Sequence, residues 1–538
     1  MPINSQIIPQ DHNAQPLILP SQSSVNINSF EETSTKLNML RTKVLERRPA
    51  LSDILHRLGP MTMYQIAESY AKDSNTAMIE LERKNEFIQT FSSEVAKILG
   101  QGVAQSTARQ LSEHYYVSTA EHHSPLTTPD YFNSSVHHAL YASDAKNSKL
   151  ENIIVLACAN VSFDNYASPR GLVFNSFSGT KPGLTQIPLF SRSVRSCPVV
   201  YYPSYGKQAI QDAKLKIDSL LREGSITPKN AEGLYFILDS VYSRNDVLNL
   251  SNYSDQITKT NYILWNKLFF FLGDYTPNLV YIEQERVVNK LLLEHHIYQN
   301  TIIHNILFNT DYHTLMEKHF DKIEGAFTLD ERTGTYLFWA LPPGQKYRVR
   351  LWKEGNKLVS EDRSYEVELT PDSLAKAITN KELIPSTMLD YILLAFYYGL
   401  KLHGGVNQPT VLSKTKIAFL RMLNELGDRM SIQECIGVPT TALSMHRPSL
   451  AFLKSPKNTL TPASSIDILL YGNKNSWNVM KQNSKNITYG EILYRTLPNL
   501  YKFVYETDEQ DKQLMNVSES EIDAITGLDK KIIPLAEV

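Results

Sequence analysis

The chain has 538 residues, which is more than one ordinary domain holds and predicts roughly two to four domains. Hydrophobic residues make up 42% and charged residues 20%, the proportions of a folded soluble protein. The formal net charge of −2 gives no electrostatic attraction for nucleic acid or for an anionic membrane, so we expect neither as a partner.

The three cysteines are odd in number and far apart, which argues against a disulfide scaffold and for a reducing compartment. The N-terminus lacks the basic region and apolar run of a secretory signal. The most apolar helical window, Met388 to Leu400, is too short to span a membrane and contains Asp390. We therefore expect a cytoplasmic protein.

Residues 1–30 are rich in polar residues and proline and are expected to form a flexible arm. Residues 31–145 have helical periodicity, with helices predicted at Met61–Ala71, Asn75–Leu99 and Gln105–Tyr116. This helical region ends in a histidine-rich segment. Four of the chain's 14 histidines fall between Glu121 and His138.

Thr128-Pro129-Asp130 has the pattern of a helix start, with threonine as the N-cap, proline at the first position and an acid in the first turn. A helix from Pro129 to Tyr141 brings Asp130, His137 and His138 toward one broad side. Because adjacent histidines on a helix diverge, we expect at most one of His137 and His138 to join a site.

HExxH and zinc-finger spacings are absent, so a structural or surface role is favoured over metal binding for any one of these residues. The cluster as a whole favours a functional site. In this hypothesis some of the histidines bind a divalent metal, zinc or iron, and Glu121 or Asp130 is a carboxylate ligand or general base. A metal-free variant keeps a histidine as general acid or base, with Arg170 holding a substrate carboxylate. The predicted metal ligands are His122, His123, His137 and His138.

Residues 146–325 are expected to form an α/β region. Asn152–Ala159 is a continuous apolar run typical of a strand buried on both faces, and three more strands are predicted at Gly171–Phe174, Thr185–Phe190 and Pro198–Tyr202. Ligands gather beyond strand ends in open α/β sheets, which makes Asp164 and Asn165 candidate substrate-binding residues. A turn in which both side chains bond their own backbone is the favoured interpretation of each residue taken singly.

A long helix is predicted from Tyr281 to Phe308, carrying Glu283, Glu285 and several histidines. Glu-x-x-His spacing is missing there. A solvated helix face or a domain contact is the favoured interpretation of this set.

Residues 326–375 alternate in polarity and predict a small antiparallel meander, in which cross-strand ion pairs with Glu366 and Glu368 account for Arg348 and Arg350.

Residues 376–510 are predicted to be mainly helical, although 428–480 look loop-rich, and 511–538 form an acidic tail. Paired glycines follow a buried helix at Leu402-His403-Gly404-Gly405. They would present His403, Asn407 and Gln408 at the end of a rigid element, as substrate-binding residues.

The chain contains no P-loop, GxGxxG, GxSxG or kinase signature, so no nucleotide cofactor is predicted. The predicted fold is α+β or mixed α/β. The predicted function is an enzyme of specialised biosynthesis that acts on a small polar molecule, a hydrolase or non-haem oxygenase if it depends on metal. The alternative is a non-enzymatic interaction or effector protein without metal. The sequence leaves the oligomeric state open.

Overall fold

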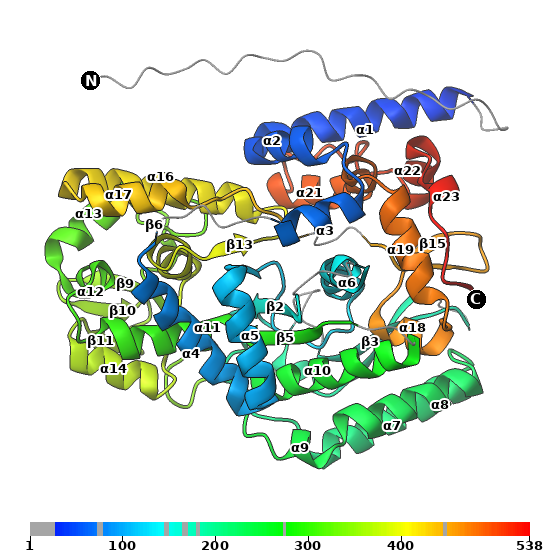
Figure 1. The fold of residues 1–538 in the computed structure, drawn as a ribbon, viewed down its shortest axis with the longest axis horizontal. Helices are drawn as coiled ribbons and strands as arrows, with labels where there is room; N and C mark the ends of the chain where they lie inside the picture. The colour runs from blue at the N-terminus through cyan, green and yellow to red at the C-terminus, as the bar shows by residue number, and fades with distance from the viewer. Residues whose placement is uncertain are drawn as a thin grey trace.

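The computed structural model describes residues 27–72, 79–144, 150–163, 170–178, 183–272, 276–444 and 449–538. The expected arm therefore lies outside the described residues, except for positions 27–30, which begin α1 (Ile27–Arg47). Helices combine with several small sheets, which confirms the predicted mixed fold (Figure 1). Within these described ranges, no helix is both long enough and apolar enough to cross a membrane.

Four parallel strands form the central sheet, in the order β13-β1-β2-β5. From β1 the chain moves outward through β2 to β5 and then returns to place β13 on the other side of β1. This is the order of a doubly wound sheet, whose winding reverses between β1 and β13. The strands are β1 (Tyr116–Ser118), β2 (Asn152–Ala157), β5 (Asn278–Glu283) and β13 (Lys401–His403).

Both faces of the central sheet are covered by helices (Figure 1). Successive residues of a strand point to opposite faces, so Val155 and Tyr281 join one hydrophobic core whereas Ile154 and Ile282 join the other. Burial on both faces explains why β2 and β5 are continuous apolar runs. The helices are α6 (Pro129–Asp144) and α10 (Tyr253–Leu272) on the first face, and α4 (Leu81–Leu99) and α5 (Gln101–Glu113) on the second.

The strand predictions for the α/β region are partly confirmed. β2 matches the first, and the next two form a hairpin of β3 (Gly171–Ser176) and β4 (Gly183–Pro188). The predicted strand Pro198–Tyr202 is wrong, since Pro198 makes only an isolated bridge to Ser162.

The predicted long helix from Tyr281 is wrong at its start. The chain stays extended as far as Glu283, because the preceding apolar run pairs with β2, and α11 (Gln284–Leu291) begins only afterwards.

The predicted meander is confirmed and gains one strand, giving the antiparallel order β11-β10-β9-β8-β12. The added strand is short and lies directly before α15 (Thr387–Tyr391). The strands are β8 (Phe338–Ala340), β9 (Val349–Glu354), β10 (Lys357–Ser360), β11 (Glu366–Glu368) and β12 (Leu383–Pro385).

Loops join helices and short strands within the described part of residues 428–480, as predicted, and Pro439 and Pro456 lie in those loops. Pro462 ends a strand, and Ser464 begins α18 through a capping box with Asp467. The acidic tail is also structured, since β16 (Ala536–Glu537) pairs with β14 (Phe452–Lys454). The other elements of this part are α16 (Gln408–Leu426), α17 (Arg429–Gly437), β15 (Leu460–Pro462), α18 (Ser465–Tyr471), α19 (Ser476–Asn486), α20 (Tyr489–Leu493), α21 (Leu497–Val504), α22 (Glu519–Thr526) and α23 (Leu528–Lys531).

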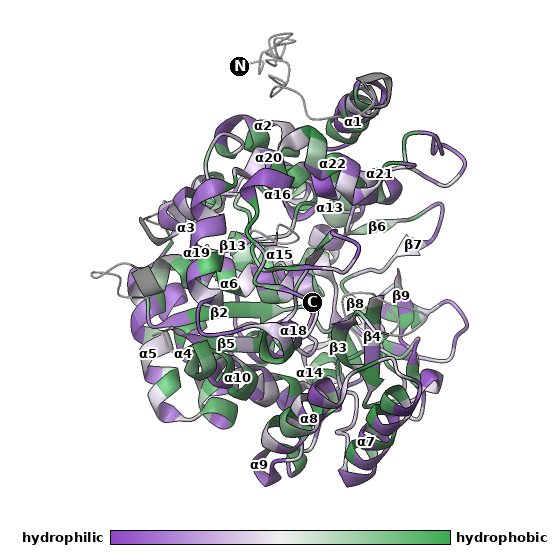
Figure 2. Ribbon diagram, turned by 90° about the vertical axis from the view of Figure 1, so that its right-hand side faces the viewer, coloured by the Kyte–Doolittle hydropathy of each residue, from purple (hydrophilic) through white to green (hydrophobic). Residues whose placement is uncertain are grey.

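Hydropathy follows this layering. In Figure 2 the strand β2 is hydrophobic along its length, whereas α7 (Lys207–Arg222), which lies at the surface, mixes hydrophilic and hydrophobic residues. The remaining elements are α2 (Pro49–Leu58), α3 (Met63–Lys72), α8 (Pro228–Ile237), α9 (Asn245–Leu248), α12 (Ile302–Phe308), α13 (Thr310–Phe320), β6 (Phe327–Thr328), β7 (Thr333–Gly334) and α14 (Pro371–Thr379).

Candidate functional site

The central strands are all parallel, so their carboxyl ends meet at one edge of the sheet, which we call the carboxyl edge. His403 ends β13, Ser118 ends β1, Cys158 follows β2 directly and Glu283 ends β5. Ligands of doubly wound sheets bind beyond this edge. Two polar groups of side chains occupy it, one at each side of the sheet.

The first group surrounds Glu121, in the loop after β1. The Glu121 side chain is fully buried, and its carboxylate accepts hydrogen bonds from Ser118 Oγ and Ser134 Oγ, both at 2.6 Å. Ser444 Oγ lies 2.8 Å from Ser134 Oγ and 3.1 Å from Ser118 Oγ. Burial raises the pKa of Glu121, and the two serine hydrogen bonds oppose that change. The predicted catalytic carboxylate is thus held between β1 and α6 by hydroxyl groups.

Five rings lie next to these serines, and we call them the ring cluster. His403 stacks on Tyr116 with 4.7 Å between ring centroids and lies 4.4 Å from Tyr70. His138 is 6.2 Å from His403 and 6.0 Å from His137, and its Nε2 atom is 3.2 Å from Ser444 Oγ. The structure thus brings three of the predicted site histidines together, including both members of the adjacent pair on α6.

Two histidines of the ring cluster have unsatisfied polar atoms. Both ring nitrogens of His137 and of His403 are buried and have no hydrogen-bond partner among the residues that the structure describes. Each buried polar atom without a partner lowers the stability of the fold by about 1–3 kcal/mol. These rings are therefore an exception to the usual pairing of buried polar atoms. Burial lowers the pKa of both imidazoles well below the ordinary value, which keeps them neutral.

The other predicted pair, His122 and His123, lies elsewhere. His123 Nε2 donates to the Ser254 carbonyl oxygen at 3.1 Å, and its ring stacks on Tyr281 of β5. Burial lowers the pKa of His123 to about 3. The His122 ring faces Tyr131, with 5.8 Å between the centroids. The histidine-rich segment is therefore buried but divided between two environments.

A metal centre would need several ligands around one point. Within the part of the chain that the structure describes, no group of three or more His, Cys, Asp and Glu side chains could hold a metal ion. Asp130, the other predicted carboxylate, lies at the start of α6 in the wall of a separate cavity of about 640 Å³. Arg495, Lys502 and Phe503 also line this cavity.

The remaining predicted residues lie apart from one another. Arg170 joins the ends of the β3–β4 hairpin, where it donates to the Phe190 carbonyl oxygen at 2.9 Å. Gln408 Oε1 accepts from Thr119 Oγ1 at 2.9 Å, and Asn407 Oδ1 accepts from Arg48 at 3.4 Å. Asp164 and Asn165 lie outside the described residues.

The second polar group lies where β2 and β5 end, and its centre is the acid pair Glu285 and Asp390. Glu285 is fully buried at the start of α11. Its carboxylate accepts from the backbone N–H groups of Ala159 and Asn160, both at 2.8 Å, and Cys158 Sγ lies 3.2 Å from Oε1. These contacts fasten the end of β2 to the start of α11.

The acid pair has abnormal protonation. Burial, together with the nearby Glu283 carboxylate, raises the pKa of Glu285 to about 7. Burial and the Glu285 carboxylate raise the pKa of Asp390 well above its usual range. Asp390 Oδ2 accepts from Gln284 Nε2 at 2.7 Å, whereas its Oδ1 is buried and has no hydrogen-bond partner in the described ranges. The two acids therefore titrate as interacting groups.

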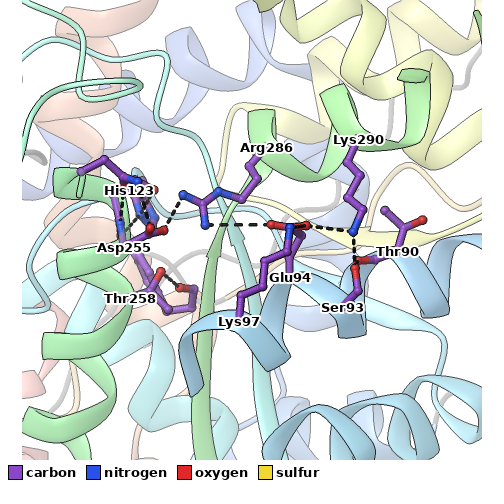
Figure 3. A network of polar contacts seen from close by, with 12 residues as sticks. Thr90, Ser93, Glu94, Lys97, His123, Asp255, Thr258, Arg286 and Lys290 are labelled. Carbon is purple, nitrogen blue, oxygen red and sulfur yellow. Dashed lines mark hydrogen bonds and ion pairs between the residues drawn. The ribbon is translucent and has the colours of Figure 1, made fainter. Parts of the chain in front are cut away.

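A network of ion pairs holds α11 in place (Figure 3). Arg286, the residue after Glu285, forms an ion pair with Asp255 of α10 and lies 4.0 Å from Glu94 of α4. Lys290 Nζ reaches the same Glu94 at 3.0 Å. Because α11 is tied to helices on both faces of the sheet, the Glu285 carboxylate has a fixed position.

A cavity of about 380 Å³ is lined by the β6–β7 hairpin, Trp339 and the start of α15. Thr387 in its wall is one helical turn from Asp390. Arg348 lies over the Trp339 ring at 4.5 Å and donates to the backbone and side-chain oxygens of Asn160. The predicted cross-strand ion pairing of Arg348 is wrong, because Arg348 turns toward the carboxyl edge and β10 separates β9 from β11.

Sequence reasoning named neither Glu285 nor Asp390 as a site residue, and it weighed Cys158 only as a cysteine without a partner. One signal was present: the apolar run Leu279–Ile282 has the length of a strand, so Glu283 and Glu285 follow a strand end. No comparable signal places Asp390 beside them, because that contact joins residues far apart in the chain.

Comparison of the chain with protein-family models and with curated proteins found no match. A functional hypothesis therefore rests on the chemistry of the carboxyl edge.

Proposed function

We propose that the protein is an enzyme that acts on a small polar molecule, with Glu285 as its general acid and base. The observation that carries the proposal is the coupled acid pair at the carboxyl end of β5, with the pKa of Glu285 at about 7. A group that transfers protons works best when its pKa lies near the operating pH. Perturbed pKa values also gather at functional sites, where burial and like charges are arranged together.

The surroundings of Glu285 support this role. At neutral pH the carboxyl group is divided between its two protonation states, so it can accept a proton and return it. Two backbone N–H donors fix its orientation, and the Glu283 charge favours the protonated form. A cavity of about 380 Å³, which has the size of a small-molecule site, has Thr387 in its wall, one helical turn before Asp390.

The proposal can be tested without a known substrate by NMR titration of the protein labelled with ¹³C at glutamate side-chain carboxyls. One resonance should titrate with a midpoint near pH 7 and vanish in Glu285→Gln. Glu283→Gln should lower this midpoint, because it removes the neighbouring negative charge that raises the Glu285 pKa. Glu366→Gln, on exposed β11, is the matched control and should leave the midpoint unchanged. A Glu285 midpoint near 4.5 would remove the basis of the proposal.

The same variants then test catalysis. Wild-type protein is incubated with a defined mixture of small polar metabolites, and product formation is followed by mass spectrometry. Glu285→Gln should lower the rate of any conversion by about 100-fold or more. A conversion that proceeds equally in Glu285→Gln and Glu366→Gln would contradict the assigned role.

Metal dependence stays a prediction. The described residues do not present a ligand set for a metal, so no step is assigned to one. Metal analysis of protein purified without a histidine tag tests the hypothesis directly. Stoichiometric zinc or iron that is lost in a folded His122→Ala/His123→Ala variant would support a metal site at that pair. Loss of the metal in a folded His137→Ala/His138→Ala variant would support a metal site in the ring cluster.

One observation favours the alternative of an interaction protein. Phe270 of α10 is 91% exposed and Phe236 of α8 is 59% exposed, and exposed aromatic residues of this size are frequent at protein contacts. Sedimentation velocity of wild-type protein and of Phe270→Ser distinguishes the cases. Association of copies that the substitution abolishes would support an interaction role for this face.

A further inference from the structure

We propose that Cys158 is a nucleophile that attacks an electrophilic carbonyl carbon of the substrate, and that Glu285 accepts its proton. This inference rests on the proposed function, because it uses Glu285 as the base. Two separate observations carry it: the contact between the thiol and Glu285, and the unpartnered Asp390 oxygen beside them.

The position of Cys158 suits a nucleophile. It follows β2 directly at the carboxyl edge, where substrates of doubly wound sheets bind. Cys197 and Cys435 are buried, whereas Cys158 is partly exposed. Its Sγ atom is 3.2 Å from Glu285 Oε1, which is hydrogen-bond distance for a thiol donor.

The charges around the thiol decide how it would react. Burial and the carboxylates of Glu285 and Asp390 raise the pKa of the Cys158 thiol, so the resting form is the neutral thiol. The nucleophile therefore forms as the proton passes to Glu285, which must itself be deprotonated beforehand. The step makes a bond from Sγ to the carbonyl carbon, moves the thiol proton to Glu285 Oε1 and moves the carbonyl electron pair onto oxygen.

Positive charge is available for that oxygen. Arg348 is held at Asn160, two residues after Cys158, and it interacts electrostatically with both Cys158 and Glu285. A planar guanidinium suits the stabilisation of a developing oxyanion. The favoured substrates are therefore esters, thioesters and amides of small polar acids.

Other titratable or charged groups face this position and set its pH response. Glu283 raises the pKa of Glu285, and Arg286 opposes the ionisation cost of Glu283. The further groups with an electrostatic interaction to Cys158 are Tyr131 of α6, Asp390 and Tyr391 of α15, and Arg348.

Alkylation by iodoacetamide of the intact chain tests the inference. Sγ bonds to the reagent carbon, iodide leaves and the thiol proton goes to Glu285. Peptide mass spectrometry should find modification at Cys158 and not at the buried Cys197 and Cys435. The rate should rise with an inflection near pH 7, from the Glu285 carboxyl. Glu285→Gln should lower the rate at pH 7.5 by tenfold or more.

A second variant keeps the test decisive if Glu285→Gln does not fold. Glu283→Gln retains the base and should move the inflection of Cys158 alkylation to lower pH, because the Glu283 carboxylate raises the Glu285 pKa. The overturning result is a Cys158 that stays unmodified, or one whose rate follows only an ordinary thiol titration in both variants. If the NMR midpoint of Glu285 is near pH 7, that result refutes only the role of Cys158 as a nucleophile. If the Glu285 midpoint is near 4.5, it refutes the proposed function as well.

A chromogenic ester then tests the substrate class. 4-Nitrophenyl acetate should acylate Cys158, with release of 4-nitrophenolate and an added acetyl mass on the Cys158 peptide. Cys158→Ser and Arg348→Met should each lower the rate of this acylation by at least tenfold. Acylation found only at lysine side chains, or unaffected by both variants, would exclude the carbonyl class.

Discussion

Replacing Glu285 with glutamine should remove a pH-dependent loss of stability. A carboxyl whose folded-state pKa is raised holds its proton more tightly when folded, so stability falls as pH rises from the unfolded value toward the folded one. For Glu285 this window runs from 4.5 to about 7. At about 1.4 kcal/mol for each pH unit, the rise from pH 5 to pH 8 costs the wild-type protein about 3 kcal/mol through this group.

Urea unfolding of wild-type protein and Glu285→Gln at pH 5 and pH 8 measures the effect. The NH₂ group of the glutamine amide would face at least one of the two backbone N–H groups that donate to the Glu285 carboxylate. This lost hydrogen bond costs about 1–3 kcal/mol of stability at both pH values, so it cancels when the two pH values are compared. The variant should gain about 3 kcal/mol relative to wild type between pH 5 and pH 8. The other buried acids and histidines also cancel, since both proteins contain them.

Glu366→Gln, the exposed control, should follow wild type at both pH values. An equal stability difference between Glu285→Gln and wild type at pH 5 and pH 8 would refute the reasoning, because it would mean that Glu285 ionises in the folded protein as it does in the unfolded chain. Asp390→Asn should also gain stability relative to wild type between pH 5 and pH 8, because burial and the Glu285 carboxylate raise the Asp390 pKa.

Two further substitutions test the carboxyl edge at the other side of the sheet. A Cβ atom at Gly404 would lie 2.1 Å from Gln408 Cδ, so Gly404→Ala should lower the free energy of urea unfolding by about 1–3 kcal/mol. The control is Gly102→Ala on α5, where a Cβ atom meets no atom within 4 Å, and it should be neutral or stabilising in the same measurement. His137→Leu removes two unpartnered buried nitrogens and should raise the unfolding free energy by about 1 kcal/mol, and a loss of several kcal/mol would instead indicate a bound group that uses this ring.

The sequence predicted the mixed fold but little of the central sheet. Among its four strands only β2 was recognised, because it is long enough to form a clear apolar run. β1 and β13 have three residues each, too few to show a periodicity. β5 lies directly before a helix, and its last residues were predicted as part of that helix. Tertiary pairing determines such strands, and local propensity does not.

The candidate site was predicted in part for the same reason. The histidine-rich segment was correctly placed next to a helix that begins at Pro129, but the Thr128 side chain makes no cap hydrogen bond. Local spacing could not show that His403 joins His137 and His138, since it arrives on a strand from a distant part of the chain. The acid pair was missed because Glu285 was assigned to a solvated helix face, while burial beside Asp390 gives it its chemistry.

The pairing of β1 with β13 has a consequence for how the protein folds. Tyr116 pairs with Lys401, so the middle of the sheet closes only after most of the chain between them has become ordered. Contacts of such long sequence separation form slowly, because the entropy of closing the loop is lost before the contact is gained. The β2–β5 half can therefore assemble earlier than the half that holds His403. In a refolding experiment, the backbone amides of β2 and β5 should become protected from hydrogen exchange before those of β1 and β13.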